Sequence, residues 1–527
     1  MAIDDRLPAL ARRALDEQAQ RDLARWRADW DAALTADGAC LPWIHEVELL
    51  VDVFHRERHA LGGFAQVLAD ERPSLVEVHG ADPPLARALT AIAGQQEVPV
   101  HLAEPGPAPR FPVGIPTPAR GRLGAVRELV GAPPFLRGDV LFQPPDRHLG
   151  GVRPAIRARG HRPVEDFLRG PPTPPRALLG QIVRGGWVAH PGGRERRRAR
   201  ALHRRLLSEL PSTPDQTDPI SVLQHSRAQT MLGQIAVDTL ADVAAARRTV
   251  ARGRLRAFVT GSGAQGAARL LAIAGREGGV PLVEVLHGFS LGLWSLDGRP
   301  APTCDGLVGD RVAAWSAHDV AVLSPHAHGK VVRTGNPGAA RAMGALAGSR
   351  TGSDPPSADG HALVLVQAPG WATAVLGVRA PVEHARGALE GLARGRPALP
   401  VLLRPHPLDP TPFDAMLGPG IRLARGGPLE PLLAGAALVV GSLSTATLEA
   451  AAAGIPTILF EPSGAPVGWP FDGSSAIPVT VDADGLAAAV AAIGPSADPA
   501  TVSDAREALG ADPGAVDAVV NLILDGT

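Results

Sequence analysis

Arginine, histidine, serine and threonine gather in two short stretches of the C-terminal third of the chain, and their types suit phosphate binding. The first stretch reads LLRPHP and carries Arg404 and His406. The second reads LVVGSLSTATLEAA, and its hydroxyl residues include Ser442, Ser444 and Thr445. Guanidinium, imidazole and hydroxyl groups all donate hydrogen bonds to phosphoryl oxygens. The combination predicts a site for the phosphate or diphosphate of a ligand.

The residues around both stretches show strand and helix patterns. The apolar runs Ala437 to Val440 and Thr457 to Phe460 predict buried strands, and Thr447 to Ala453 between them predicts a helix. Pro400 to Leu403 predicts a further strand before the arginine. In parallel sheets, ligands bind beyond the carboxyl ends of the strands, where a helix N-terminus attracts anions. We therefore expect both stretches to line one crevice.

Glu449 lies one helical turn beyond the hydroxyl residues. Its carboxylate is close enough to the expected start of the helix to accept hydrogen bonds from the diol of a ribose. The alternative is a surface glutamate that pairs with neighbours along its own helix. Together with the phosphate donors, the first interpretation predicts a nucleotide site.

Three residues are candidates for a general base. His287 follows the predicted strand Leu282 to Leu286, and a histidine at that end of a strand can accept a proton near neutral pH. His79 and Asp82 follow the predicted strand Leu75 to Val78 in an equivalent place, and either is an alternative base. For His287 the competing interpretation is a histidine that only hydrogen-bonds a loop.

A glycine pattern after the predicted strand that ends at Thr260 resembles a dinucleotide fingerprint. Gly261, Gly263 and Gly266 have the G-x-G-x-x-G spacing, ahead of a predicted helix. The next strand, however, does not end in the acidic residue that would bind a ribose. We favour a tight strand-to-helix turn over an NAD or FAD site.

The pair His326 and His328 raises the question of a metal site. No third ligand of convincing spacing accompanies them, so a loop is the expected structure. The sequence therefore predicts no bound metal and no cofactor.

Cysteine content and the N-terminus bear on the compartment. Cys40 and Cys304 are the only cysteines, too few for a disulfide framework or a thiolate metal site, as expected in a reducing cytosol. Asp4, Asp5 and Arg6 are followed by no apolar segment, which argues against a signal peptide. We expect a cytoplasmic protein.

A basic stretch, RERRRARALHRR from Arg194 to Arg205, has helical character. It predicts either a solvated helix face with intrahelical ion pairs or a contact with an anionic acceptor or the inner face of a membrane. No aromatic residues interleave the arginines, and the chain has 52 basic against 53 acidic residues, so we expect no nucleic-acid partner.

The 527 residues are too many for one core. We predict an α/β fold with a helical N-terminal segment at 1–70, a Rossmann-like acceptor domain at 71–345 and a Rossmann-like donor domain at 346–527, facing each other across a cleft. Prolines crowd residues 104–175, where we expect a long connection or insertion without regular elements. Ile3 to Leu34 and Asp218 to Ala246 have helical patterns, and a polar linker runs from Ala347 to Gly360.

The motifs LRPHP, SLSTATLEAAAAGIPTILF, GVPLVEVLHG and VVRTGNPG resemble those of the GT-B glycosyltransferases that build bacterial surface polysaccharides. The capsule and polysialic-acid type transferases and the glycerophosphotransferases of teichoic-acid synthesis are most similar by pattern. The resemblance extends over Leu255 to Val490. It implies that Arg404 and His406 contact the donor phosphates and that Glu449 binds the ribose.

The resemblance also implies roles for the remaining candidates. Ser442, Ser444 and Thr445 would bind phosphate, and His287 would be the acceptor base, whereas sialyltransferase-like relatives use an aspartate of the N-terminal domain. The glycerophosphotransferases carry a Ser-Ser pair followed by aspartates, and this chain has SLST with Glu449 instead. The difference favours a sugar donor over glycerol phosphate.

We therefore predict a metal-independent glycosyltransferase that moves a sugar from a nucleotide donor to a hydroxyl of a glycan or lipid-linked acceptor, in surface polysaccharide or glycoconjugate synthesis. Three alternatives remain: a glycerophosphotransferase of the CDP-glycerol type, a nucleotide-sugar 2-epimerase of the same fold, and a non-catalytic binding or scaffold protein. Product analysis and nucleotide-binding measurements distinguish them.

Overall fold

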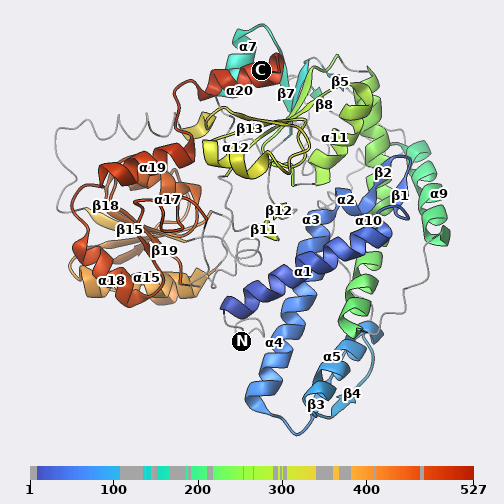
Figure 1. Ribbon diagram of the computed structural model, residues 1–527, viewed down its shortest axis with the longest axis horizontal. Coiled ribbons are helices and arrows are strands. Elements are labelled where there is room, and N and C mark those ends of the chain that lie inside the picture. The colour runs from blue at the N-terminus through green and yellow to red at the C-terminus, as the bar shows by residue number, and fades with distance from the viewer. Residues whose placement is uncertain are drawn as a thin grey trace. The chain divides into compact units, whose positions relative to one another are not determined.

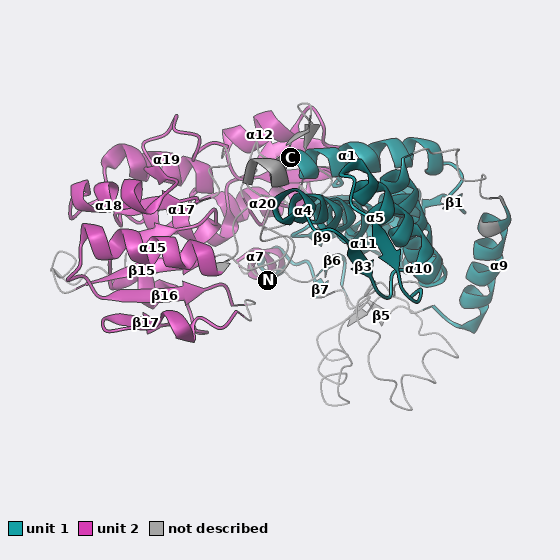
Figure 2. Ribbon diagram, turned by 90° about the horizontal axis from the view of Figure 1, so that it is seen from below, with its two compact units in different colours: residues 1–145, 157–283, 308–310 teal, residues 146–156, 284–307, 311–527 magenta. Residues whose placement is uncertain are grey.

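The computed structural model describes most of the chain. The described residues are 9–106, 135–136, 138–143, 149, 151–165, 186–187, 191–209, 218–252, 254–264, 266–288, 295–296, 299–300, 306–339, 343, 360–366, 381–407, 411–462 and 468–526. They form two compact units (Figure 2). Unit 1 comprises residues 1–145, 157–283 and 308–310, and unit 2 comprises residues 146–156, 284–307 and 311–527. The predicted domain boundaries at 70 and 345 stay predictions.

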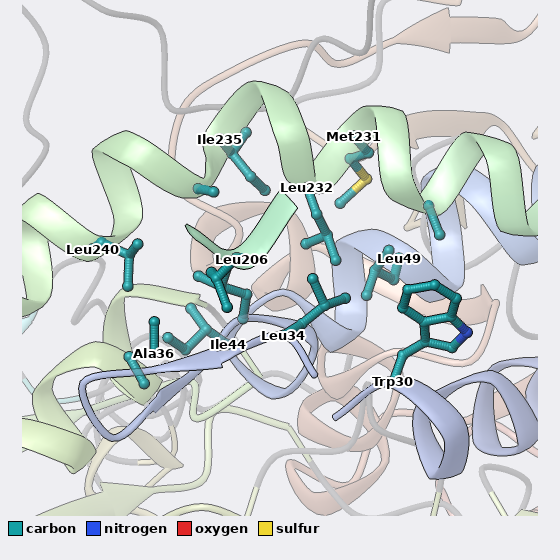
Figure 3. Close-up of a cluster of buried hydrophobic side chains, with 14 of the residues drawn as sticks. Trp30, Leu34, Ala36, Ile44, Leu49, Leu206, Met231, Leu232, Ile235 and Leu240 are labelled. Atoms are coloured by element: carbon teal, nitrogen blue, oxygen red, sulfur yellow. The ribbon is translucent and has the colours of Figure 1, made fainter. Parts of the chain in front are cut away.

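Unit 1 contains a bundle of long and short helices. Its members are α1 (Ala9–Trp30), α2 (Leu41–Ile44), α3 (Glu46–Leu49), the π-helix η2 (Leu50–His55), α4 (Arg56–Glu71), α9 (Gly193–Glu209), the 34-residue α10 (Pro219–Arg252) and α11 (Gly266–Gly278) (Figure 1). Side chains of α10, such as Met231 and Leu232, pack against Trp30 and Leu49 in a shared apolar core (Figure 3). The described parts of the predicted helices Ile3 to Leu34 and Asp218 to Ala246 are thus confirmed.

The predicted strand Leu75 to Val78 belongs to a separate small sheet. Strands β3 (Val76–Val78) and β4 (Val100–Leu102) pair in parallel around α5 (Pro83–Gln95). These two strands form a two-stranded sheet of their own. Each strand has only three residues, and Val76 and Val100 pack with apolar residues of the neighbouring helices α4 and α5 in one cluster.

The first six-stranded sheet has the order β14-β13-β10-β9-β6-β7. Its strands are β6 (Val140–Gln143), β7 (Pro163–Glu165), β9 (Ala257–Thr260), β10 (Leu282–Val285), β13 (Arg311–Ala314) and β14 (Lys330–Arg333). β9 confirms the strand predicted to end at Thr260, and β10 confirms the strand predicted to begin at Leu282. With α7 (Val152–Ala158), β6 and β7 contradict the expectation that residues 104–175 hold no regular element. The prolines flank the apolar run of β6 without entering it, and Pro163 begins an edge strand, where a missing N–H costs little.

The second six-stranded sheet has the order β17-β16-β15-β18-β19-β20, with every pair parallel. Its strands are β15 (His361–Val366), β16 (Val401–Pro405), β17 (Ile421–Leu423), β18 (Ala436–Gly441), β19 (Thr457–Phe460) and β20 (Val479–Thr480). In chain order this is 3-2-1-4-5-6, the order of the Rossmann fold. The α/β fold class with two parallel six-stranded sheets is therefore confirmed, while a cleft between the sheets stays a prediction.

Helices cover both faces of the second sheet. Alternate strand residues such as Val364 and Leu403 pack with α15 (Pro381–Gly395) and α18 (Ala483–Ala492). The opposite face, with Leu363 and Val439, packs with α16 (Glu430–Ala434) and α17 (Thr445–Ala452). This two-sided burial explains why the strands are continuous apolar runs. Further elements of unit 2 are α12 (Ala317–Leu323), η5 (Asp414–Met416), α19 (Pro499–Leu509) and α20 (Ala515–Leu524).

Three two-residue strand pairs complete the described elements. They are β1 (Thr35–Ala36) with β2 (Ala39–Cys40), β5 (Phe135–Leu136) with β8 (Gly186–Trp187), and β11 (Ser295–Leu296) with β12 (Arg299–Pro300). Across the described residues, no helix combines the length and apolar character needed to cross a bilayer. The predicted linker at 347–359 lies outside the described residues.

Candidate functional site

The candidate donor site lies where strand order reverses in the second sheet. β15 runs between β16 and β18, and the segments that follow these two neighbours both bond to its last residues. The backbone N–H of His406 donates to the Val366 carbonyl at 2.9 Å, and that of Ser442 donates to the Leu365 carbonyl at 3.2 Å. Two strand spacings, about 10 Å, therefore separate the two backbones. In open α/β sheets this reversal is where ligands bind.

The turn from β18 into α17 is held tightly. Ser444 is the N-cap residue, and its hydroxyl accepts from the Thr447 N–H at 3.3 Å. The Thr447 hydroxyl donates to the Ser442 carbonyl at 2.7 Å and lies 3.0 Å from the Ser444 hydroxyl. A Cβ on Gly441 would come within 2.1 Å of the Thr447 hydroxyl, so glycine is required here. Thr447 is not among the residues predicted from the sequence, although its spacing of three from a serine is a capping signal.

The Ser442 hydroxyl is the unsatisfied group of this turn. Ser442 is 2% exposed, and its Oγ has no hydrogen-bond partner among the described residues. A buried hydroxyl without a partner costs about 1–3 kcal/mol. Thr445 begins the adjacent helix, whose first N–H groups have no acceptor within the helix. An anion bound here would satisfy both the hydroxyl and the helix N-terminus.

Arg404 has a role that local sequence does not reveal. Its guanidinium donates to the carbonyls of Ala424 at 3.0 Å, of Gly427 at 2.8 Å and of Gly426. Burial lowers the pKa of Arg404, whose residue exposure is 6%. The side chain therefore holds the loop after β17 against the end of β16. Its predicted contact with phosphate stays a prediction, as does that of the half-buried His406.

Glu449 lies in the second turn of α17 and is half-buried. Burial, and then the negative charge of Glu430 on α16, raise the pKa of Glu449 to about 7. The neutral and charged forms are therefore about equally populated near neutral pH. A carboxyl group in this state can either accept or donate a hydrogen bond.

His287 comes just after β10, and its side chain is exposed. The strand end before it is fixed, because the Leu286 N–H donates to the Ala313 carbonyl at 3.2 Å. The Leu286 carbonyl in turn accepts from the Trp315 indole N–H at 2.8 Å. A rigid backbone thus presents an accessible imidazole at the carboxyl end of a strand, and its role as base stays a prediction.

His79 and Asp82 do not occupy a place equivalent to that of His287, because β3 belongs to the separate small sheet. His79 is exposed, with Nε2 at 3.4 Å from a Glu77 oxygen. Asp82 is the N-cap residue of α5, and Arg227 binds both its oxygens at 2.5 and 2.9 Å. This buried bidentate pair joins α5 to α10, which is a structural arrangement for a carboxylate.

Two further motifs have structural explanations. A Cβ on Gly266 would lie 3.2 Å from the Ile44 carbonyl and 3.4 Å from a Glu48 oxygen, so the start of α11 is covered by backbone and a carboxylate. This close packing supports the tight turn that we favoured over a dinucleotide site. His326 and His328 are exposed in the loop between α12 and β14, as expected. In the part of the chain that the structure describes, no group of three potential ligands could hold a metal ion.

Comparisons with known proteins complete this description. No protein-family model and no curated protein matches the chain. Among solved structures, UDP-GlcNAc 2-epimerase from Methanocaldococcus jannaschii is similar at 11% identity and a TM-score of 0.39, covering 69% of this chain and 97% of that one. The wall teichoic acid polymerase TagF is similar at 11% identity and a TM-score of 0.38, covering 73% and 88%. Arabidopsis thaliana UGT89C1, complexed with UDP, is similar at 12% identity and a TM-score of 0.42, covering 73% and 99%. Likeness this distant carries no functional argument.

Proposed function

We propose that this protein is a glycosyltransferase that transfers a sugar from a nucleotide donor to a hydroxyl group of a glycan or lipid-linked acceptor. The observation that carries the proposal is the buried, unsatisfied hydroxyl of Ser442 beside the N-terminus of α17, at the strand-order reversal of a Rossmann-type sheet. A buried polar group without a partner beside a positive helix end favours an anionic ligand. The donor diphosphate is such an anion.

In the proposed complex the donor lies across the end of β15. Ser442 and the first N–H groups of α17 bind one phosphate, and His406, on the other side of β15, binds the second. The sugar-phosphate bond breaks as negative charge develops on the departing nucleotide. Fixed donors stabilise that charge, and one such donor contributes about 3 kcal/mol to lowering the barrier. The helix end and the imidazole supply positive potential that a metal ion supplies in other enzymes.

Two further residues complete the proposed mechanism. Glu449, in the second turn of α17, accepts hydrogen bonds from the ribose hydroxyls in its charged form. His287 accepts the proton of the acceptor hydroxyl, whose oxygen then bonds to the sugar carbon as the nucleotide leaves. The exposed position of His287 gives a bulky acceptor access. We place the reaction in the cytoplasm and assign its product to surface polysaccharides or glycoconjugates.

The test is nucleotide binding by the Ser442→Ala variant. Isothermal titration of the native chain against CMP-, CDP-, UDP- and GDP-linked compounds should identify one donor class. The variant should bind that donor at least tenfold more weakly, yet unfold at an equal or higher temperature, because the unsatisfied hydroxyl is gone. Ser324→Ala, which removes an exposed serine at the end of α12, is the matched control and should change neither quantity.

Two results would refute the proposal. The native chain binding none of the compounds would indicate a non-catalytic protein, and equal donor affinity in Ser442→Ala would exclude this anion site. Product analysis then separates a transferase, which consumes the acceptor, from an epimerase, which does not. If the chain transferred glycerol phosphate and not a sugar, the proposed donor would be wrong, but the proposed phosphate-binding site would still hold.

A further inference from the structure

Helix α9 presents one strongly basic face to solvent. Within it, six arginines are exposed, and on a helix of 3.6 residues per turn they fall within an arc of about 160°. We call this surface the arginine face. Its members are Arg194, Arg197, Arg198, Arg200, Arg204 and Arg205. Over 17 residues the helix extends about 25 Å, so the charges form a stripe and not a single pocket.

The opposite side of α9 fixes this orientation. Ala199 and Leu206 are buried, and Leu206 reaches into the core shared with α10 (Figure 3). Arg196 pairs with Asp238 of α10 at 2.7 Å. Arg248 of α10 pairs with Glu195 at 2.5 Å. The helix is therefore held along its apolar side, which leaves the arginine face exposed. Helix α9 itself lies at the margin of unit 1 (Figure 2).

Few acidic groups neutralise the arginine face. Arg198 pairs with Asp37 at 3.2 Å, and its side chain is still 68% exposed. Among the described residues, no acidic side chain forms an ion pair with Arg197, Arg200 or Arg204. Like charges held close together without partners destabilise a helix. An external anionic surface would relieve that repulsion.

The composition of the face discriminates between anionic partners. A free phosphate needs donors that converge on one point, and these arginines are spread along a line. Protein interfaces depend on buried aromatic or apolar anchors, whereas the only other exposed residues of α9, among those whose burial is described, are Ala201 and Ser208. Single-stranded nucleic acid is bound with stacking aromatics, and residues 191–209 contain no Phe, Tyr or Trp. A flat anionic bilayer can bind a row of positive charges that lacks aromatic and apolar anchors.

We propose that the arginine face of α9 binds the protein peripherally to membranes that contain anionic lipids. The binding is electrostatic and reversible, because the six arginines that define the face bind through their charge and not by insertion. It does not depend on the proposed transferase activity, since the surface lies outside the donor site. For a transferase acting on a lipid-linked acceptor, it would concentrate the enzyme where that acceptor is found.

The experiment is co-sedimentation of the full chain with vesicles of phosphatidylcholine alone, or of phosphatidylcholine and phosphatidylglycerol in equal parts. We expect binding only to the mixed vesicles, and its loss as salt shortens the screening length. The variant R197Q/R200Q/R204Q should bind on the order of a hundredfold more weakly, because each basic residue near an anionic surface contributes about a factor of five. The variant R197K/R200K/R204K should retain binding.

A matched control removes the same charge elsewhere. The variant R25Q/R87Q/R157Q replaces exposed arginines of α1, α5 and α7 and should bind as the native chain does. Circular dichroism confirms folding of each variant, and nucleotide titration shows whether the donor site is intact. The proposal is overturned if the glutamine variant of α9 binds normally, if both vesicle types bind equally, or if duplex DNA binds more tightly than the mixed vesicles.

Discussion

Replacing Glu449 with glutamine should change how the stability of the protein depends on pH. The ordinary pKa of this carboxyl is 4.5, and burial, followed by the charge of Glu430, raises it to about 7. The folded protein therefore binds the proton more tightly than the unfolded chain does. The contribution of the Glu449 carboxyl to the free energy of unfolding is fully present below pH 4.5, and it is lost as the pH rises through about 7.

The size of the effect follows from the two pKa values. The difference between 4.5 and about 7 corresponds to about 3 kcal/mol of unfolding free energy, lost between the acidic and the alkaline condition. Glutamine keeps the size of the side chain and cannot ionise. The Glu449→Gln variant should therefore gain about 3 kcal/mol relative to the native chain at about pH 8, and almost nothing at about pH 4.5.

The assay is urea unfolding followed by circular dichroism, with native and variant chains compared at both pH values. Glu430→Gln is the matched control, because it removes only the second cause of the raised pKa and should give a smaller gain. Equal stability differences at the two pH values would show that Glu449 titrates normally. Donor affinity of the native chain should also rise as the pH increases through 7, since the charged form accepts the ribose hydroxyls.

Three other substitutions separate structural from chemical roles. Asp82→Asn should destabilise the protein by about 1–3 kcal/mol in thermal unfolding, because it removes one of the two carboxylates, Asp82 and Glu57, that pair with the buried Arg227. A stable variant that has lost transfer activity would instead identify Asp82 as a base. Arg404→Lys should increase hydrogen exchange at residues 424–427, since one ammonium cannot reproduce the bonds to three carbonyls. Unchanged exchange would contradict the role of Arg404 in anchoring this loop. Gly441→Ala should cost at least about 1–3 kcal/mol, because its methyl group would overlap the Thr447 hydroxyl, and an unchanged melting temperature would refute that packing argument.

The sequence alone determined three strands of the second sheet, β16, β18 and β19, together with helix α17 and the place of the hydroxyl residues. Ala436–Gly441 and Thr457–Phe460 are apolar because helices bury both faces of a parallel sheet, and glycine and proline end the segment between them. These are local signals, so a single stretch of chain contains them. The capping position of Ser444 could be inferred in the same way.

Tertiary structure decided the features that depend on contacts between residues far apart in the chain, namely strand order, ion pairs and burial. The strand order that sets Ser442 beside the end of β15 comes from pairing between distant segments, and β6 joins its sheet although prolines surround it in sequence. Asp82 meets Arg227 across 145 positions, which makes a candidate base into half of a buried ion pair. Arg404 binds loop carbonyls, and the pKa of Glu449 depends on its burial. Partners and burial of this kind arise only when the chain is packed, so residue types and spacing cannot specify them.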